Sequence, residues 1–224
     1  MSRKQLLIGL VALAAIGLGI IAWLAFFSGG SGSNEMLSST DGALPVEITS
    51  NDRPMGSPKA PVVIVEYAAP TCPHCARFDQ EIFPLLKQKY IDTGKVYYVF
   101  RVFPLNQVDI AAEAMARCMP AQNYMSFIDL LYRNQPKWDP EYGVTDVHAG
   151  LVAMGRLAGM SAEQVDACIG DQDEEKRIEQ VGTYAQTRYC IDGTPTFIVN
   201  GEKRVGESTW ADWQTYLDGK IRGK

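Results

Sequence analysis

The sequence has little histidine, no block of lysine or arginine, and too few cysteines for a disulfide-stapled scaffold. The 224 residues include 2 His and 5 Cys, and the formal net charge is −5. Because a protein that follows a phosphate backbone needs clustered basic residues, this sequence does not favour nucleic-acid binding. Hydrophobic residues make up 46% and charged residues 21%, which excludes a collagenous or wholly disordered chain. The length allows one domain, or two at most.

Charged residues are absent from one long segment, residues 6–27. At about 1.5 Å per residue, a helix of this length reaches roughly 33 Å and crosses the ~30 Å hydrocarbon core of a bilayer. Arg3 and Lys4 precede the segment, and no basic residue follows until Arg53. The positive-inside rule therefore predicts a single-pass anchor at 1–27 in the inner (cytoplasmic) membrane, with the rest exported to the periplasmic side. A cleaved signal peptide is the alternative, although its apolar region is usually shorter.

Residues 28–58 have the composition of a flexible linker, dominated by Gly, Ser, Asn and Asp. One short alternating stretch, 46–49, is typical of an edge strand. The sequence thus predicts a linker at 28–58 and a folded domain at 59–224.

The folded domain alternates strand and helix patterns. We expect a long helix that begins after residue 72, ends near residue 91 and breaks near Pro84. Ser161 and Gln164 can form a capping box, and Ser208 can cap the last helix. The other strands are expected at 62–67, 96–103, 196–199 and 203–205, and the other helices at 108–118, 122–132, 145–159, 161–169 and 173–189.

A Cys72-Pro73-His74-Cys75 motif stands between the first buried strand and this helix. Unpaired backbone N–H groups and the positive end of the helix dipole favour a thiolate on the first cysteine. The thiolate is the attacking species in disulfide exchange. Pro73 suits the first helical turn, and His74 can add a positive charge beside the thiolate. The motif therefore predicts a redox-active cysteine pair.

Two other uses of the motif remain open at this point. A zinc site needs four ligands, but the other cysteines are single and His148 is the only other histidine. A plain structural disulfide of this spacing is uncommon. The position between a strand and a helix favours the redox pair over both.

The segments GSPKAPVVIVEYAAPTCPHC and GTPTFIVNG resemble the DsbA-like branch of the thioredoxin superfamily, over about residues 57–221. The resemblance implies an α/β thioredoxin-like fold with an all-helical domain inserted at about 107–189. It also implies that Cys72 is the nucleophile and Cys75 the resolving cysteine. Pro195 would be a cis-proline that faces them, although an ordinary trans-proline would be the better reading of that residue alone. The backbone of Thr194 would pair with the substrate.

Glu66 is an acid in an otherwise apolar strand, six residues before Cys72, where the family has a buried acid. Period-two counting places it on the same strand face as Val62 and Ile64. A buried carboxyl there would have a raised pKa and could move the proton of Cys75. The alternative is a glutamate at the end of a strand that reaches solvent.

The resemblance implies an enzyme, a thiol:disulfide oxidoreductase that introduces disulfides into exported proteins with free thiols. A quinone-linked membrane partner would reoxidise the Cys72–Cys75 disulfide, and no metal or organic cofactor would be needed. Thr194 stands where well-known soluble oxidases have valine, which favours a reductase or isomerase, for instance one serving cytochrome c maturation, as the alternative. A non-catalytic chaperone and glutathione-transferase-like chemistry are further alternatives.

Three cysteines lie outside the motif. Cys118 and Cys168 both fall inside the predicted insertion, and we expect them to pair in an oxidising compartment. The alternative is that all three are small buried hydrophobic residues. Cys190 is expected to be buried and free.

Overall fold

The structure is a computed structural model that describes residues 44–223. The predicted anchor at 1–27 and the first part of the predicted linker, 28–43, lie outside the described residues. Within residues 44–223, none of the helices combines the length and the apolar character that crossing a membrane requires.

A five-stranded sheet forms the centre of the described part, with the strand order β1-β3-β2-β4-β5. The β-branched run predicted as the first buried strand forms β2, which pairs in parallel with β3 and antiparallel with β4. β5 pairs antiparallel with β4, and the short β1 pairs antiparallel with β3. The strands are β1 (Met55–Gly56), β2 (Val62–Ala68), β3 (Val96–Val102), β4 (Thr196–Val199) and β5 (Glu202–Val205).

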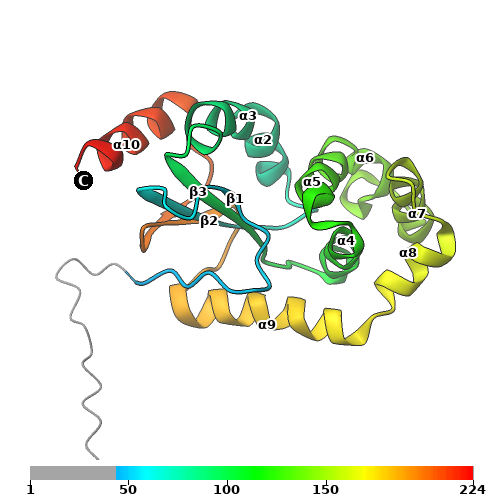
Figure 1. Cartoon of the computed structure of the whole chain (residues 1–224). Coiled ribbons are helices and arrows are strands. Elements are labelled where there is room, and N and C mark those ends of the chain that lie inside the picture. Colours follow the sequence, from blue (N-terminus) through cyan, green and yellow to red (C-terminus); the bar gives the residue numbers. More distant parts are fainter. Residues whose placement is uncertain (1–43, 224) are drawn as a thin grey trace, which may run out of the picture. The chain divides into compact units, whose positions relative to one another are not determined.

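Helices cover both faces of this sheet (Figure 1). α2 (Pro73–Glu81), α3 (Phe83–Leu86) and α10 (Trp210–Arg222) lie on one face, and α9 (Gln172–Tyr189) lies on the other. The alternation of side chains along β2 explains the two layers. Its even-numbered apolar residues join the larger core with α2 and α10, and its odd-numbered ones join a smaller core with α9.

The helix that follows the cysteine motif breaks where the sequence predicts. α2 ends at Glu81, and α3 begins with Pro84 in its first turn, where the missing N–H costs nothing. A π-helical turn, η1 (Lys87–Ile91), completes the segment before β3. This connection supplies the crossover that the parallel pair β2 and β3 requires.

A helical block lies between β3 and the sheet-covering part of α9, as the sequence predicts. The indole of Trp138 is fully buried in it and donates to the carbonyl of Leu131 at 2.9 Å. Ser161 and Gln164 form the predicted capping box. The block comprises α4 (Gln107–Cys118), η2 (Ala121–Asn123), α5 (Tyr124–Arg133), α6 (Gln135–Trp138), η3 (Pro140–Tyr142), α7 (Val147–Leu157) and α8 (Ala162–Ile169).

Three local predictions are wrong. Residues 46–49 form no strand: Val46 and Ile48 pack on the smaller core, so their alternating pattern reflects contact with a sheet face. Residues 44–58 of the predicted linker belong to the folded unit. Thr209, and not Ser208, caps α10, because its hydroxyl accepts from the N–H of Asp212 in a capping box.

Candidate active site

The turn after β2 places Cys72 at the start of α2. Cys72 is the N-cap residue, and its Sγ accepts a hydrogen bond from the N–H of Cys75 at 3.3 Å. Pro73 occupies the first helical turn, as predicted. Cys72 is 5% exposed and Cys75 is fully buried, and both are free thiols. The structure therefore brings the two sulfurs together with Cys72 as the outer one.

A second loop meets this helix start. The peptide bond between Thr194 and Pro195 is cis, and the Thr194 carbonyl oxygen lies 3.5 Å from the Sγ of Cys72. The Pro195 carbonyl accepts from the N–H of Gly206 at 2.8 Å, which joins this loop to the end of β5. The two segments that carry the sequence resemblance thus meet at the Cys72 sulfur.

The two thiols have opposite acidities. The hydrogen bond with the Cys75 thiol lowers the pKa of Cys72 to about 6, with further lowering by Thr194 and by the backbone N–H groups of Cys75 and His74, while burial opposes the shift. Burial raises the pKa of Cys75 well above the usual thiol range, and the nearby Cys72 and Glu66 raise it further. At neutral pH the outer sulfur is a thiolate and the inner one a thiol, as a nucleophile and a resolving thiol need to be.

Glu66 lies buried on β2 beneath the pair, and it does not reach solvent. Its carboxylate accepts a hydrogen bond from the hydroxyl of Tyr98 on β3. Burial raises the pKa of Glu66 to about 8, Tyr98 partly opposes this, and the charge of Cys72 adds to it. Glu66 therefore holds a proton at neutral pH, close enough to the thiols for their charges to affect one another.

Comparison with known proteins is consistent with this geometry. A family model described as thioredoxin matches residues 49–219. The chain belongs to the thioredoxin family.

Within the thioredoxin family, the similar solved structures include DsbA proteins. The crystal structure of Wolbachia pipientis alpha-DsbA1 is 27% identical, with a TM-score of 0.73, and the match covers 80% of this chain and 94% of that one. The predicted resemblance to the DsbA-like branch is therefore confirmed, as is the thioredoxin-like fold with its helical insertion.

Two groups of sequence relatives have matching names. A Rickettsia typhi protein named as a protein-disulfide oxidoreductase is 39% identical over 157 residues, or 69% of this chain and 57% of the relative. A Bacillus cereus protein named disulfide bond formation protein D is 28% identical over 207 residues, or 89% of this chain and 90% of the relative. The chain thus spans a little over half the length of the Rickettsia relative.

His74 has a partner that the sequence did not predict. Its imidazole is 58% exposed, and its Nδ1 lies 3.0 Å from Oε1 of Glu207, in the loop before α10. The same oxygen accepts from Arg77 at 2.7 Å. The His74 backbone N–H helps to lower the pKa of Cys72, whereas the ring is paired with a carboxylate. Glu207 therefore offsets positive charge beside the thiolate of this thioredoxin-family member.

We expect the Glu207→Gln variant to lower the pKa of Cys72 by roughly half a unit at low ionic strength, because the variant lacks the carboxylate that pairs with His74 and Arg77 on the same helix as the thiolate. Thiolate absorbance at 240 nm against pH measures this. Glu202→Gln is the matched control, since Glu202 is an exposed β5 residue that pairs with Lys220. An unchanged Cys72 pKa in Glu207→Gln, or the same change in Glu202→Gln, would contradict the role given to Glu207.

The insertion contributes residues that the sequence did not single out. Gln135 on α6 is buried, and its amide donates to the carbonyls of Pro70 at 2.8 Å and Cys72 at 3.2 Å. Asp109 on α4 accepts from the N–H of Thr71 at 2.8 Å. Both contacts fix the turn before α2, so the insertion helps to shape the thioredoxin-family site.

The remaining cysteines divide into a pair and a free thiol. Cys118 and Cys168 form a disulfide that joins α4 to α8, the pairing expected from the sequence. Cys190 is free, as predicted, but it is exposed, and the prediction of burial is wrong. It ends α9 in the left-handed conformation (φ 51°), and this turn directs it away from the core.

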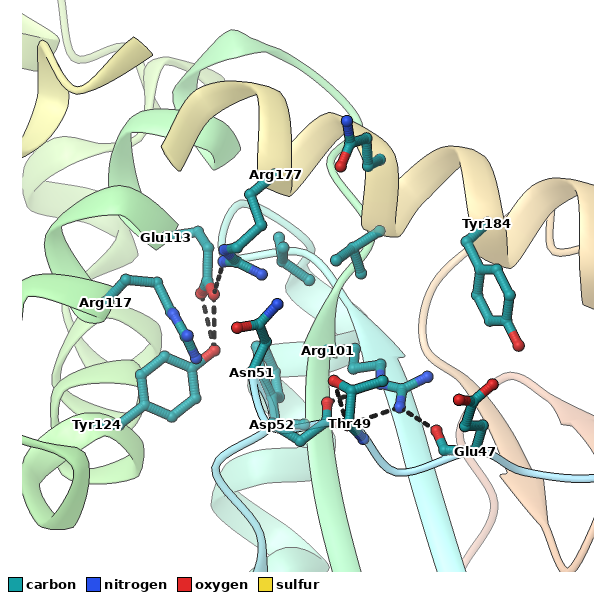
Figure 2. A pocket seen from close by; sticks show the side chains of 14 residues that line it. Glu47, Thr49, Asn51, Asp52, Arg101, Glu113, Arg117, Tyr124, Arg177 and Tyr184 are labelled. Carbon is teal, nitrogen blue, oxygen red and sulfur yellow. Dashed lines mark hydrogen bonds and ion pairs between the residues drawn. The ribbon is translucent and has the colours of Figure 1, made fainter. Parts of the chain in front are cut away.

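A cavity of about 220 Å³ lies away from the cysteine pair, between β3, α4 and α9 (Figure 2). Its basic side chains already have partners. Arg101 binds Asp52 through two nitrogens at 2.8 Å, and Arg177 donates to Glu174. The arginine side chains that line the cavity are therefore already paired with carboxylates. Among the described residues, no group of three or more His, Cys, Asp or Glu side chains could hold a metal ion.

Proposed function

We propose that this protein is a thiol:disulfide oxidoreductase that introduces disulfides into exported proteins through Cys72 and Cys75. One observation carries the proposal: a thiol with a pKa of about 6 at a helix N-terminus, beside the Thr194 carbonyl and above a buried thiol. The names of the relatives and the DsbA-type structure support the same activity.

The geometry supports a simple exchange. In the oxidised enzyme, a substrate thiolate attacks Sγ of Cys72, the bond to Cys75 breaks, and the electron pair leaves on the Cys75 sulfur. Cys75 then takes a proton, in keeping with its high pKa. A second substrate thiolate attacks the substrate sulfur of the mixed disulfide. Cys72 leaves as a stable thiolate, and the substrate gains a disulfide.

Pro195 and Thr194 would hold the substrate in this step. The Thr194 backbone faces the reacting sulfur, so an extended substrate segment can pair with it while its cysteine reaches Cys72. A quinone-linked membrane partner would reoxidise the pair, and no metal or organic cofactor is required. The proposal includes anchoring by residues 6–27 in the inner membrane, with the active site on the periplasmic side.

The size of the pKa shift of Cys72 is also compatible with a second function, that of a reductase or isomerase on the same fold. Relative to an ordinary thiol, a pKa of about 6 stabilises the reduced form by roughly tenfold at pH 7, or about 30 mV. The gap between thioredoxin and DsbA is about 150 mV, so thiolate stabilisation alone does not decide the direction. Thr194 before the cis-proline favours the weaker oxidant.

Equilibration with glutathione buffers tests the proposed direction. We expect a reduction potential of about −120 mV, the DsbA value, and a value of about −270 mV would instead support the reductase.

In the same preparation, the rate of Cys72 alkylation by iodoacetamide should rise with pH, with a midpoint near pH 6. At pH values under this midpoint the thiolate fraction decreases, so the rate of alkylation should decrease as well. A midpoint near about 8.5 would contradict both functions.

A further inference from the structure

The turn that carries Cys72 depends on other segments for its backbone hydrogen bonds. Pro70 and Pro73 stand on either side of Thr71 and Cys72, and neither proline has an N–H to donate. Within the turn, the Cys72 N–H donates to the carbonyl of Ala69 at 3.0 Å. The turn is buried, so its remaining polar groups need partners from outside it.

Gln135, the first residue of α6, supplies two of these partners. Its Nε2 donates to the carbonyl of Pro70 at 2.8 Å and to that of Cys72 at 3.2 Å. Asp109 accepts from the N–H of Thr71 at 2.8 Å. Gln135 is 2% exposed, and a buried carbonyl that loses its donor is unfavourable. The turn therefore keeps to the position in which both bonds from Gln135 form.

Tyr142 fixes the direction in which the Gln135 amide points. Its hydroxyl donates to the Oε1 of Gln135 at 3.3 Å. A reversed amide would place Oε1 against two carbonyl oxygens, which are acceptors like itself. Tyr142 lies on η3, whose first turn Asp139 caps by accepting from the N–H of Glu141 at 3.0 Å. Tyr142 is 49% exposed, so these hydrogen bonds run from the surface of the insertion to the backbone of Cys72.

The position of Cys72 decides how its sulfur meets two other segments. The Sγ accepts from the N–H of Cys75 on α2 at 3.3 Å, and it lies 3.5 Å from the carbonyl oxygen of Thr194 in the loop before β4. A displacement of about 1 Å can slow a reaction by about 10²-fold, because the reacting atoms must be aligned. The backbone of Cys72 must therefore stay in place relative to α2 and to the Thr194 loop at once.

We propose that Gln135, oriented by Tyr142, is a positioning residue that holds the Cys72 sulfur in place for thiol–disulfide exchange. The inference rests on the proposed function. Gln135 donates to backbone oxygens, so it acts through the position of Cys72 and takes no part in the bond changes. Two residues of the insertion would thus set the reactivity of a sulfur that belongs to the thioredoxin core.

The Gln135→Met variant tests this role, because methionine keeps the length of the buried side chain and removes its donors. The oxidised protein is mixed with reduced glutathione between pH 5 and 9, and its free thiols are counted by maleimide labelling and mass spectrometry. We expect reduction to be about tenfold slower at every pH, because Cys72 is no longer held in one position. The midpoint of its thiolate absorbance at 240 nm should rise above pH 6, since the contacts that lower its pKa depend on that position.

The Tyr142→Phe variant separates positioning from packing. It keeps the half-exposed ring and loses the hydroxyl, so it should fold and should slow reduction about threefold. In the Gln135→Met background, the same substitution should have no further effect, because Tyr142 acts through the Gln135 amide. Asn134→Ala is the matched control, since the Asn134 amide donates to the carbonyl of Leu130 at 2.8 Å, within the insertion. This control should react at the unaltered rate and keep its absorbance midpoint near pH 6.

Each of three results would overturn the positioning role. They are unaltered rates and midpoints in Gln135→Met, an undiminished effect of Tyr142→Phe in the Gln135→Met background, and equal slowing in Asn134→Ala. If Gln135→Met does not fold, Tyr142→Phe is compared with Asn134→Ala: slowing in Tyr142→Phe alone supports the role, and equal rates overturn it. If the unaltered protein does not exchange with glutathione, the proposed function fails, and the positioning role fails with it. Unaltered variants of an active protein would reject the positioning role alone.

Discussion

The Cys72→Ser variant should lose thiol–disulfide exchange by about 10³-fold or more, the largest effect expected of any single substitution in this chain. Cys72 is the outer sulfur, with a pKa of about 6, whereas Cys75 is buried with a raised pKa and cannot replace it as the nucleophile. Oxidation of a reduced dithiol peptide, followed by mass spectrometry, measures the loss. Circular dichroism should show an unchanged fold, because serine is close in size to cysteine.

The Cys75→Ser variant completes this test. Its Cys72 thiolate should still attack a peptide disulfide, and the mixed disulfide should accumulate because no inner thiol resolves it. In a Cys75→Ala variant, which lacks any side-chain donor, the pKa of Cys72 should rise, because the hydrogen bond from the Cys75 thiol contributes most to lowering it. A non-reducing gel and the 240 nm absorbance show both results. Full function of Cys72→Ser in a complementation assay would instead support the non-catalytic chaperone.

Strands β2 to β5 were readable from the sequence because their signals are local, whereas the two-residue β1 fell in the predicted linker. The run that forms β2 is β-branched and buried on both faces, so it predicted a central strand, and the proline before β4 marked its start. The pattern at 46–49 misled because Val46 and Ile48 alternate as in a strand, yet they pack on a face of the sheet without pairing. A single sequence does not distinguish these two uses of alternation.

The predictable part of the site is likewise the part made by neighbours in the chain. Cys72, Pro73 and Cys75 lie in one turn, and their roles follow from the geometry of a helix start. The partners of the site come from distant segments: Glu207 reaches His74 across 133 positions, and Tyr98 reaches Glu66 across 32. No local pattern signals such contacts, so the pairing of His74 could not be predicted.

The disulfide offers the second large effect. Removing it in the Cys118→Ala/Cys168→Ala double variant should lower the free energy of unfolding by about 4 kcal/mol, since the bond closes a loop of 50 residues. The expected fall in Tm is roughly 10 °C. Cys190→Ala is the matched control: Cys190 is exposed and unbonded, so its loss should change the free energy by less than about 0.5 kcal/mol.

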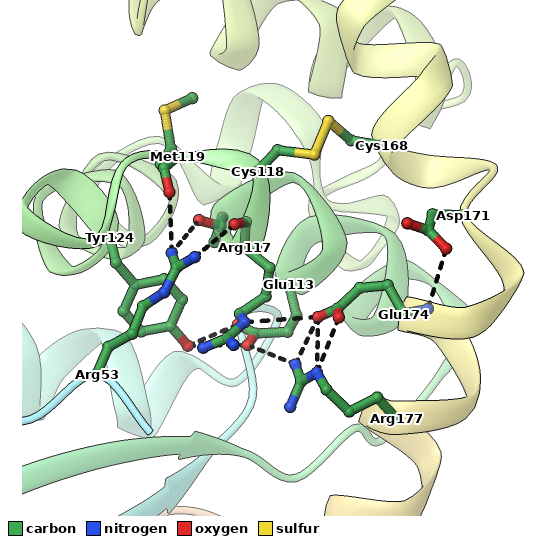
Figure 3. A network of polar contacts seen from close by, with 11 residues as sticks. Arg53, Glu113, Arg117, Cys118, Met119, Tyr124, Cys168, Asp171, Glu174 and Arg177 are labelled. Carbon is green, nitrogen blue, oxygen red and sulfur yellow. Dashed lines mark hydrogen bonds and ion pairs between the residues drawn. A yellow bond between two sulfur atoms is a disulfide. The ribbon is translucent and has the colours of Figure 1, made fainter. Parts of the chain in front are cut away.

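The active site should keep its structure without the disulfide, because other contacts hold the insertion together near the end of α4 (Figure 3). Arg53 donates to the carbonyls of Ala116 at 3.2 Å, Arg117 at 2.7 Å and Met119 at 3.0 Å, and so caps the end of α4 without the disulfide. Arg177 on α9 donates to Glu174, which lies 3.6 Å from Arg117. We therefore expect the double variant to unfold earlier on heating, yet to keep the Cys72 midpoint near pH 6 at 25 °C. A shifted Cys72 midpoint would show that the disulfide also orders the active site. An unchanged Tm would show that these contacts stabilise the end of α4 without the disulfide.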